Sequence, residues 1–344
     1  MAYTTIDDPS AYFKVQLYTG TGSSTAFAFD DTDTDMQPDL VWLKIRGDDT
    51  HNVYDVVRGV QERIETSTTD AEYTESEGLT AFGSDGFTLG SSNQANPSSG
   101  TAVAWCWKTQ GGAGSSNTDG GINTTSTSVS QTAGFSISTW TGTGSTATVG
   151  HGLGAVPKFI TTKARSDTYD WYTYHASLGN TKNVYINLTN AAGSASANFH
   201  NNTDPTSSVW TSGGAIYNDD YTFVTYAFAP KQGFSNFGTY EGNGNADGTF
   251  VYTGFRPAFV MTKSVDSTSD WHIFDDQRLG YNVDNNTLAA NLSDAEATTD
   301  MIDILSNGFK CRITTDPNVA ETYVYVAFAK APLVNSNGVP CNAR

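Results

Sequence analysis

Cations, cysteines and long apolar runs are all scarce in this chain of 344 residues. Lysine and arginine number 18 against 36 aspartates and glutamates, which leaves a formal net charge of -18 at pH 7. Binding of nucleic acid requires clustered cations that neutralise phosphates, so we expect no nucleic-acid partner. No stretch approaches the roughly 18 apolar residues of a membrane span. The N-terminus has neither the cationic start nor the apolar core of a secretion signal, and we expect no membrane insertion.

The cysteines and histidines show no spacing that is typical of a metal site or of a catalytic motif. Cys106, Cys311 and Cys341 form no CxxC pair, so we predict three free thiols, with Cys106 in the core and Cys341 at the surface. Free thiols suit a protein made in a reducing cytoplasm. The five histidines have no HxH or HExxH spacing, and no serine lies in a GxSxG motif. We therefore predict no catalytic residue, no cofactor and no metal centre.

One acidic segment is a weak candidate for Ca²⁺. Asp31, Asp33 and Asp35 alternate with threonines, and carboxylate oxygens on alternate residues could surround a calcium ion. The segment lacks the glycine and the distant glutamate of an EF-hand loop. The alternative is a solvated hairpin tip.

One block of sequence occurs three times. Each copy contains a proline that leads into a short segment ending in lysine, followed later by an aromatic segment that begins at a valine. The proline segments are 38–44, 157–163 and 257–263, and the valines are Val103, Val224 and Val324. The proline and the valine are 65 residues apart in the first copy and 67 in each of the others. Such regular spacing indicates a repeat protein.

The composition of the copies predicts an all-β fold. β-branched and aromatic residues dominate the short segments, and aromatic residues on alternate positions indicate one face that packs in a core. We predict three tandem antiparallel β-sandwich-like repeats of about 100 residues, each closing its own aromatic core. The boundaries are repeat 1 with a short N-terminal arm at 1–108, a Gly/Ser/Thr-rich linker at 109–133, repeat 2 at 134–230, repeat 3 at 231–332 and a C-terminal tail at 333–344. The linker composition predicts a flexible segment and a mobile repeat 1, whereas repeats 2 and 3 are closely joined.

Acidic residues also recur at equivalent places. Residues 69–72 (Thr-Asp-Ala-Glu) and 293–296 (Ser-Asp-Ala-Glu) fit the capping box that begins a helix, but repeat 2 has Thr-Asn-Ala-Ala at 189–192. Because repeat 2 lacks the glutamate, we predict a structural rather than a catalytic role for these carboxylates.

An aspartate and an arginine three residues apart recur in repeats 1 and 3. They are Asp55 with Arg58 and Asp275 with Arg278, which we predict to be ion pairs that order a loop, each contributing roughly 0.5 kcal/mol if exposed.

Two aspartate-tryptophan pairs are the candidate ligand-binding residues. Asp170 with Trp171, and Asp270 with Trp271, could bind a sugar, because the ring can stack on a sugar face while the carboxylate accepts its hydroxyls. The alternative is a pair of tryptophans that anchor the core. Glycoside hydrolysis requires two carboxyl groups across a cleft. Glu241, Asp270 and Asp275 are candidates, but the sequence does not pair them.

Several segments resemble the repeated β domains of virion structural proteins of tailed phages that infect marine bacteria and cyanobacteria, which include tail fibre-type proteins. The Thr-Gly-Thr-Gly turns and four further segments carry the resemblance: 150–157, 252–260, 305–310 and 327–332. It covers roughly residues 13–332.

The resemblance implies a non-enzymatic phage structural protein, either a tail fibre or a tail accessory component. Such a protein would be assembled in the host cytoplasm and displayed on the virion, where it contacts the host surface. The expected partners are other virion proteins, copies of the same chain in a homo-oligomer, with a trimer as the first expectation, and a host-surface glycan. The alternatives are a capsid decoration protein without a ligand and a carbohydrate-active depolymerase.

Overall fold

The regular secondary structure of the described residues is almost entirely antiparallel β-sheet, which confirms the predicted all-β fold class. The computed structural model describes residues 3–29, 34–194, 196–214, 216–217, 220–278, 282 and 286–341. Within these residues the helical elements are short: the 3₁₀ turns η1 (Pro9–Ala11) and η2 (Ala176–Leu178) and the single turn α1 (Ser196–Phe199).

The same strand order occurs in one large sheet of each repeat, and a smaller sheet packs beside it. The large sheet of repeat 1 runs β1 (Phe13–Thr19), β9 (Thr101–Trp107), β3 (Leu40–Ile45), β4 (His51–Asp55), β5 (Gly59–Glu65) and β6 (Tyr73–Thr74). That of repeat 2 runs β10 (Ser126–Ser130), β11 (Phe135–Thr141), β17 (Thr222–Phe228), β13 (Phe159–Ala164), β14 (Tyr172–His175) and β15 (Val184–Tyr185). That of repeat 3 runs β18 (Ser235–Glu241), β25 (Thr322–Pro332), β20 (Phe255–Ser264), β21 (His272–Asp275) and β22 (Leu288–Ala289).

The smaller sheets complete each sandwich. They are β2 (Thr25–Ala28), β8 (Gly86–Leu89) and β7 (Leu79–Gly83) in repeat 1, β12 (Ala147–Gly150) and β16 (Val209–Ser212) in repeat 2, and β19 (Phe250–Tyr252), β24 (Gly308–Cys311) and β23 (Ile302–Leu305) in repeat 3.

The closing strand of each repeat lies inside its large sheet: β9 between β1 and β3, β17 between β11 and β13, and β25 between β18 and β20, a strand that contains Pro257 instead of following it. In repeat 1, Trp105 of β9 pairs with Val15 on one side and with Trp42 on the other. Alternate residues of β9 point to opposite faces. Ala104 and Cys106 therefore face the sandwich core of repeat 1, whereas Trp105 faces a second core.

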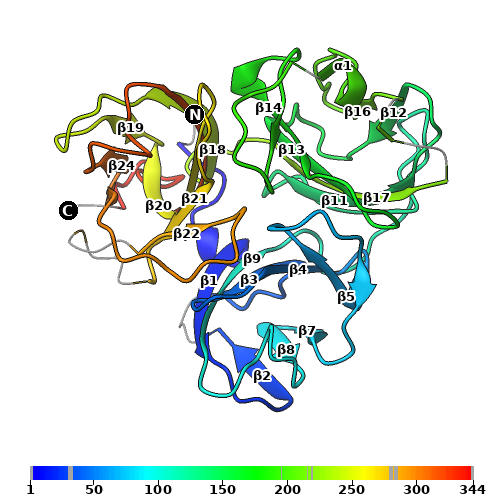
Figure 1. Cartoon of the computed structure of the whole chain (residues 1–344), viewed down its shortest axis with the longest axis horizontal. Helices are drawn as coiled ribbons and strands as arrows, with labels where there is room; N and C mark the ends of the chain where they lie inside the picture. The colour runs from blue at the N-terminus through cyan, green and yellow to red at the C-terminus, as the bar shows by residue number, and fades with distance from the viewer. Residues whose placement is uncertain are drawn as a thin grey trace.

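This second core is shared by all three repeats. Figure 1 shows the repeats arranged around a common centre, with repeat 1 at the bottom, repeat 2 at the upper right and repeat 3 at the upper left. Trp107, Phe228 and Phe328 occupy equivalent positions in the three closing strands, and their rings meet there. The centroid distances are 6.4 Å (Trp107 to Phe228), 5.5 Å (Trp107 to Phe328) and 5.5 Å (Phe228 to Phe328). Repeats 1 and 2 also have sandwich cores of their own, so the expectation of one closed core in each repeat leaves out the additional core that the inward faces of the three large sheets share.

The segment 109–133 is not a flexible linker. It contains β10, which pairs with β11, and the backbone N–H and the hydroxyl of Thr109 donate to the Asp39 carboxylate at 2.7 and 2.9 Å. Ile122 forms a bridge with Val149 of β12. Backbone groups with such partners are fixed whatever the composition of the segment, and repeat 1 packs against both other repeats rather than moving independently.

Candidate functional site

The acidic motifs that recur in the sequence lie at the boundaries between repeats. We call residues 69–72, 189–192 and 293–296 the straps. The strap of repeat 1 lies on repeat 2, where Glu72 N–H donates to the Arg165 carbonyl at 2.8 Å. Equivalent bonds join Ala192 to Val265 of repeat 3 at 2.9 Å, and Glu296 to Arg46 of repeat 1 at 2.8 Å. Each repeat thus holds the next, and repeat 3 closes the ring on repeat 1.

The straps are not helical, so the predicted capping boxes are absent. Instead of reaching back to its own backbone, the Glu72 carboxylate accepts from Nε and Nη2 of Arg165 at 3.0 and 2.6 Å. Glu296 binds Arg46 in the same way, with Nη2 to Oε1 at 2.5 Å. The prediction of a structural role for these carboxylates agrees with these contacts.

The two aspartate-arginine pairs are buried beneath these straps and contact the neighbouring repeat at the same boundaries. Both side chains of Asp55 and Arg58 are fully buried, with Arg58 Nε 2.5 Å from Asp55 Oδ2, and Arg58 Nη1 reaches Glu72 at 3.0 Å. Asp55 Oδ2 also accepts from the Tyr226 hydroxyl of repeat 2 at 2.7 Å. The ion pair predicted from the sequence is present and is buried, so the energy given for an exposed pair does not apply to it. Three charges and a hydroxyl satisfy one another there, as buried charges require.

Repeat 3 contacts repeat 1 through the same arrangement. Asp275 Oδ2 lies 2.6 Å from Nε of Arg278 and accepts from Trp105 Nε1 of repeat 1 at 3.0 Å. Arg278 Nη1 in turn reaches Glu296 at 2.9 Å.

The boundary between repeats 2 and 3 lacks the whole network. His175 and Leu178 replace the aspartate and arginine, Ala192 replaces the glutamate and Val265 replaces the surface arginine. His175 Nε2 lies 3.2 Å from the Tyr325 carbonyl of repeat 3, and burial lowers the pKa of His175 to about 4, which keeps the ring neutral at pH 7. All members of the network change together, so no charge is left buried without a partner.

The tryptophans of the two predicted sugar-binding pairs are buried at these same boundaries. Trp171 and Trp271 are 2% and 0% exposed, and their Nε1 atoms donate to the carbonyls of Glu65 and Tyr185 in the preceding repeat at 2.8 and 2.7 Å. Neither ring has a face open to a ligand, so the sugar-stacking prediction is wrong and the alternative, an anchor in the core, is correct.

The aspartates of those two pairs stabilise the loops that lead into the tryptophans. Asp170 accepts from Asn187 Nδ2 at 2.8 Å, and Asp270 from Asn291 Nδ2 at 2.7 Å. The same asparagines accept the backbone N–H of Trp171 and of Trp271.

Three equivalent lysines, each one residue before the end of its strand in β3, β13 and β20, are also buried. Lys44, Lys163 and Lys263 have no exposed surface, and their ammonium groups donate to backbone carbonyls, including that of Ser293 for Lys44 and that of Thr69 for Lys163. Burial lowers the pKa of each lysine to about 8. Two of the three therefore bind the strap of a neighbouring repeat directly.

The remaining acidic candidates do not form a catalytic pair. Asp275 is engaged by Arg278 and Trp105, as described above, and Glu241 ends β18 at the surface. Asp31 and Asp33 lie outside the described residues, and Asp35 is exposed. Within the part of the chain that the structure describes, no three His, Cys, Asp or Glu side chains are grouped so that they could hold a metal ion.

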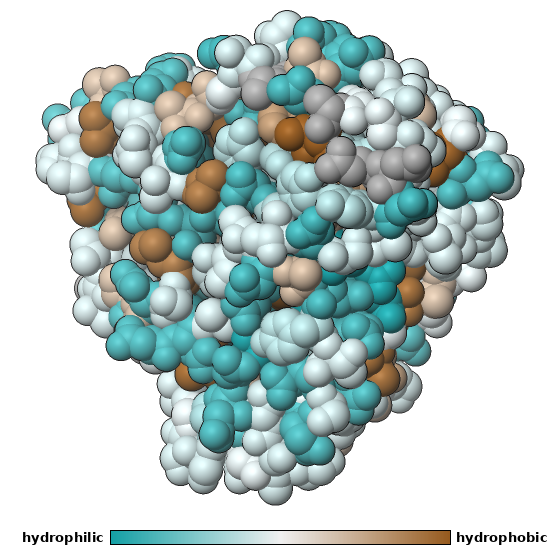
Figure 2. Space-filling view, turned by 45° about the vertical axis from the view of Figure 1, so that its right-hand side comes forward, coloured by the Kyte–Doolittle hydropathy of each residue, from teal (hydrophilic) through white to brown (hydrophobic). Residues whose placement is uncertain are grey.

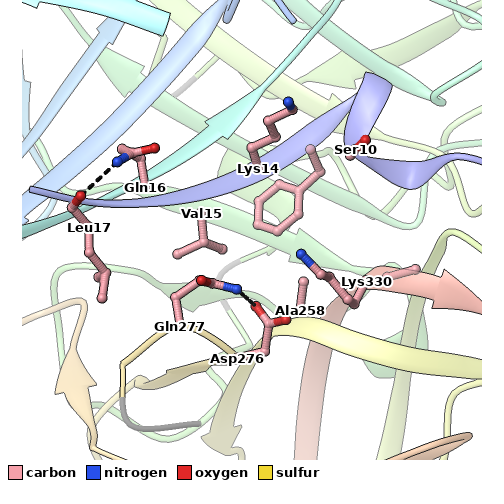
Figure 3. A pocket seen from close by; sticks show the side chains of 11 residues that line it. Ser10, Lys14, Val15, Gln16, Leu17, Ala258, Asp276, Gln277 and Lys330 are labelled. Carbon is pink, nitrogen blue, oxygen red and sulfur yellow. Dashed lines mark hydrogen bonds between the residues drawn. The ribbon is translucent and has the colours of Figure 1, made fainter. Parts of the chain in front are cut away.

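A cavity of about 190 Å³ lies where β1 of repeat 1 meets repeat 3. Figure 3 shows Asp276 in this cavity, accepting from Gln277 at 3.1 Å, with Lys330 beside it and Gln16 on the opposite wall. Burial raises the pKa of Asp276. Asp276 is the one carboxylate among the described lining residues. Glycoside hydrolysis needs a second carboxyl group a few ångströms away, so this cavity does not supply a hydrolytic pair.

The thiols are free as predicted, with Cys106 and Cys311 buried and Cys341 exposed. No helix within the described residues has the length and apolar character needed to cross a membrane. The face in Figure 2 carries apolar residues scattered among polar ones.

These features define an all-β protein whose three similar units close into one ring around a shared aromatic core. The chain belongs to the family described as "Domain of unknown function (DUF7483)", whose model matches residues 8–332. No curated protein and no solved structure matches the chain.

Proposed function

We propose that the protein is a non-enzymatic structural component of a tailed-phage virion, of the tail fibre or tail accessory type, that contacts the host surface. The observation that supports a structural role best is the use made of the recurring charged and aromatic residues. Asp55, Asp275, Glu72 and Glu296, which an enzyme could use as acids or bases, are each held by an arginine at a boundary between repeats. These ion pairs join repeat 1 to repeat 2 and repeat 3 to repeat 1.

The closed ring fits a component of a particle. Virion appendages are built on symmetry axes, and this single chain places three similar units around one centre. The excess of acidic residues keeps such a component soluble before assembly. The assignment to a phage particle itself rests on the resemblance of segments such as 150–157 and 252–260.

The trimer expected from the sequence remains a prediction. Three repeats within one chain already match a threefold axis, so a monomer would fit the same position on a particle. Sedimentation equilibrium of the purified chain separates the two assemblies.

The test of the proposal is to locate the protein on the particle. Purified virions from infected cells should contain the protein in a fixed ratio to the major structural proteins, and cryo-electron microscopy with a labelled chain should place it on the tail. Absence from purified particles would overturn the proposal. Location on the capsid surface would instead support the decoration protein named above.

A depolymerase is tested separately. A reducing-sugar assay on host envelope polysaccharide, with the wild-type chain and the Asp276→Asn variant, should show no turnover by either. Turnover that is lost with Asp276→Asn would overturn the non-enzymatic assignment.

A further inference from the structure

Three aromatic side chains of high exposure belong to repeat 3 and the arm beside it. Tyr252 and Phe250 of β19 are 55% and 45% exposed, and Tyr3 is 54% exposed. Phe250 and Tyr252 are two positions apart on one strand, so both project from the same outward face. Burial of such rings against a ligand would remove a large apolar area from water.

Comparison of the repeats shows that the fold does not need aromatic residues there. Val251 of β19 pairs with the buried Phe309, just as Phe27 of β2 pairs with the buried Phe87. The neighbours of Phe27 that face outward are Ala26 and Ala28, both exposed. Repeat 1 thus builds the equivalent strand pair with small outward-facing residues.

In repeat 2 the chain itself covers the equivalent face. Thr148 and Gly150 of β12 stand at the equivalent positions, and Gly121 N–H donates to the Thr148 hydroxyl at 2.8 Å. The open aromatic face is therefore a property of repeat 3 and not a requirement of the sandwich.

A pocket of about 350 Å³ lies between two of these rings. Tyr3 and Tyr252 line it together with residues that include Gln232, Asn236 and Ser235. Its volume is within the roughly 300–1,000 Å³ of small-molecule sites. The pocket thus combines two flat aromatic rings with amide and hydroxyl groups.

We propose that this aromatic pocket, lined by Tyr3 and Tyr252 and extended along β19 by the exposed ring of Phe250, binds a neutral sugar unit of a host-surface glycan. Aromatic rings stack on the C–H face of a hexose, and the exposed amide of Gln232 can exchange hydrogen bonds with its hydroxyls. The pocket lining contains no cation among the described residues, and the chain carries a net charge of -18, so a sulfated or uronic-acid glycan is disfavoured. This inference rests on the proposed function, for which it names the ligand and its site.

The test uses the full chain on an array of neutral glucose, galactose and mannose oligosaccharides, printed beside uronate and sulfated oligosaccharides. The variant Phe250→Ala/Tyr252→Ala gives repeat 3 the residues that repeat 1 already carries, so it should fold with an unchanged melting temperature. The matched control is Val156→Ala, which truncates a residue that is 50% exposed in repeat 2.

We expect the wild-type chain and Val156→Ala to bind at least one neutral class, and the double variant to bind it at least about tenfold more weakly, a loss of about 1.4 kcal/mol. No binding to any neutral member at about 0.1 mM protein, preference for the acidic members, or equal binding by the double variant would each overturn the inference. Because the array uses the isolated chain, these outcomes leave the location of the protein on the particle as a separate result.

Discussion

Removal of the Glu72 carboxylate should destabilise the whole ring. This carboxylate lies between two arginines: Arg165 of repeat 2, which binds it with two nitrogens, and Arg58 of its own repeat at 3.0 Å. The side chain of Arg58 is fully buried, whereas that of Arg165 is 23% exposed. In the Glu72→Ala variant the two cations face each other with Asp55 as the one remaining counter-charge.

The expected loss follows from these exposures. Breaking a buried ion pair by removing one partner costs roughly 3–5 kcal/mol. We expect about 3 kcal/mol for Glu72→Ala, because Asp55 still neutralises Arg58 and water reaches Arg165. Arg165→Val removes a partly exposed partner and should cost about 1 kcal/mol.

The boundary between repeats 2 and 3 supplies the matched comparison. Five substitutions give the boundary between repeats 1 and 2 the same residues: Asp55→His, Arg58→Leu, Glu72→Ala, Arg165→Val and Tyr226→Val. Replacement of a buried charge network as a unit is often close to neutral, so this variant should be more stable than Glu72→Ala alone.

The assay is urea denaturation monitored by tryptophan fluorescence, since Trp171 of repeat 2 lies at this boundary and donates to the Glu65 carbonyl of repeat 1. Glu77→Ala, which truncates an exposed glutamate of repeat 1, is the control and should change the free energy of unfolding by less than about 1 kcal/mol. The reasoning is refuted if Glu72→Ala unfolds like the wild type, or if the fivefold variant is less stable than Glu72→Ala.

Three further outcomes are expected. The folded pKa of about 8 for Lys44, Lys163 and Lys263 lies below the 10.5 of a free lysine, so the unfolded chain binds more protons between pH 8 and 10. The contribution of these lysines to the free energy of unfolding therefore rises with pH. Urea denaturation at pH 8 and pH 10 should show a smaller rise in this free energy for Lys263→Met than for the wild type. Trp271→Phe leaves the partly buried Tyr185 carbonyl without this donor and should cost about 1 kcal/mol in thermal denaturation, whereas no loss would argue against an anchoring role. Phe328→Ala should cost about 3–5 kcal/mol and raise amide exchange in all three repeats, because its ring contacts Trp107 and Phe228; exchange raised in repeat 3 alone would contradict a shared core.

The sequence was sufficient to predict the strands and the all-β class, because these depend on local patterns. The triplicated spacing predicts strands at 38–44, 157–163 and 257–263, and a strand overlaps each segment in the structure, although β20 begins at Phe255, before the proline. Cys106 falls in the core and Cys341 at the surface as its neighbours indicated.

The assembly of the repeats could not be predicted, because its contacts join residues far apart in the chain. Glu72 and Arg165 are separated by 93 positions, and Arg46 and Glu296 by 250. A local pattern such as Thr-Asp-Ala-Glu also fits a helix start, and nothing within four residues shows that the glutamate extends to another repeat. The sequence does indicate that the closing strand β9 is buried on both faces. Residues 102–107 contain no charged residue, and a strand without alternating polar residues is typical of a sheet that is covered on both sides.

The aromatic pocket of repeat 3 was also missed, although a comparison of the copies could have found it. Phe250 and Tyr252 stand where repeat 1 has alanines, but the equivalence of these positions depends on strand register. The register became clear only from the pairing of Val251 with Phe309 and of Phe27 with Phe87.

The central claim is that the three repeats form one cooperative unit around a shared core. The most direct measurement is hydrogen exchange of the full chain at increasing denaturant concentration, with protection measured separately for each repeat. A closed ring predicts one transition, with the strands β9, β17 and β25 losing protection at the same denaturant concentration. Loss of protection in repeat 1 at lower denaturant, while repeats 2 and 3 stay protected, would contradict it.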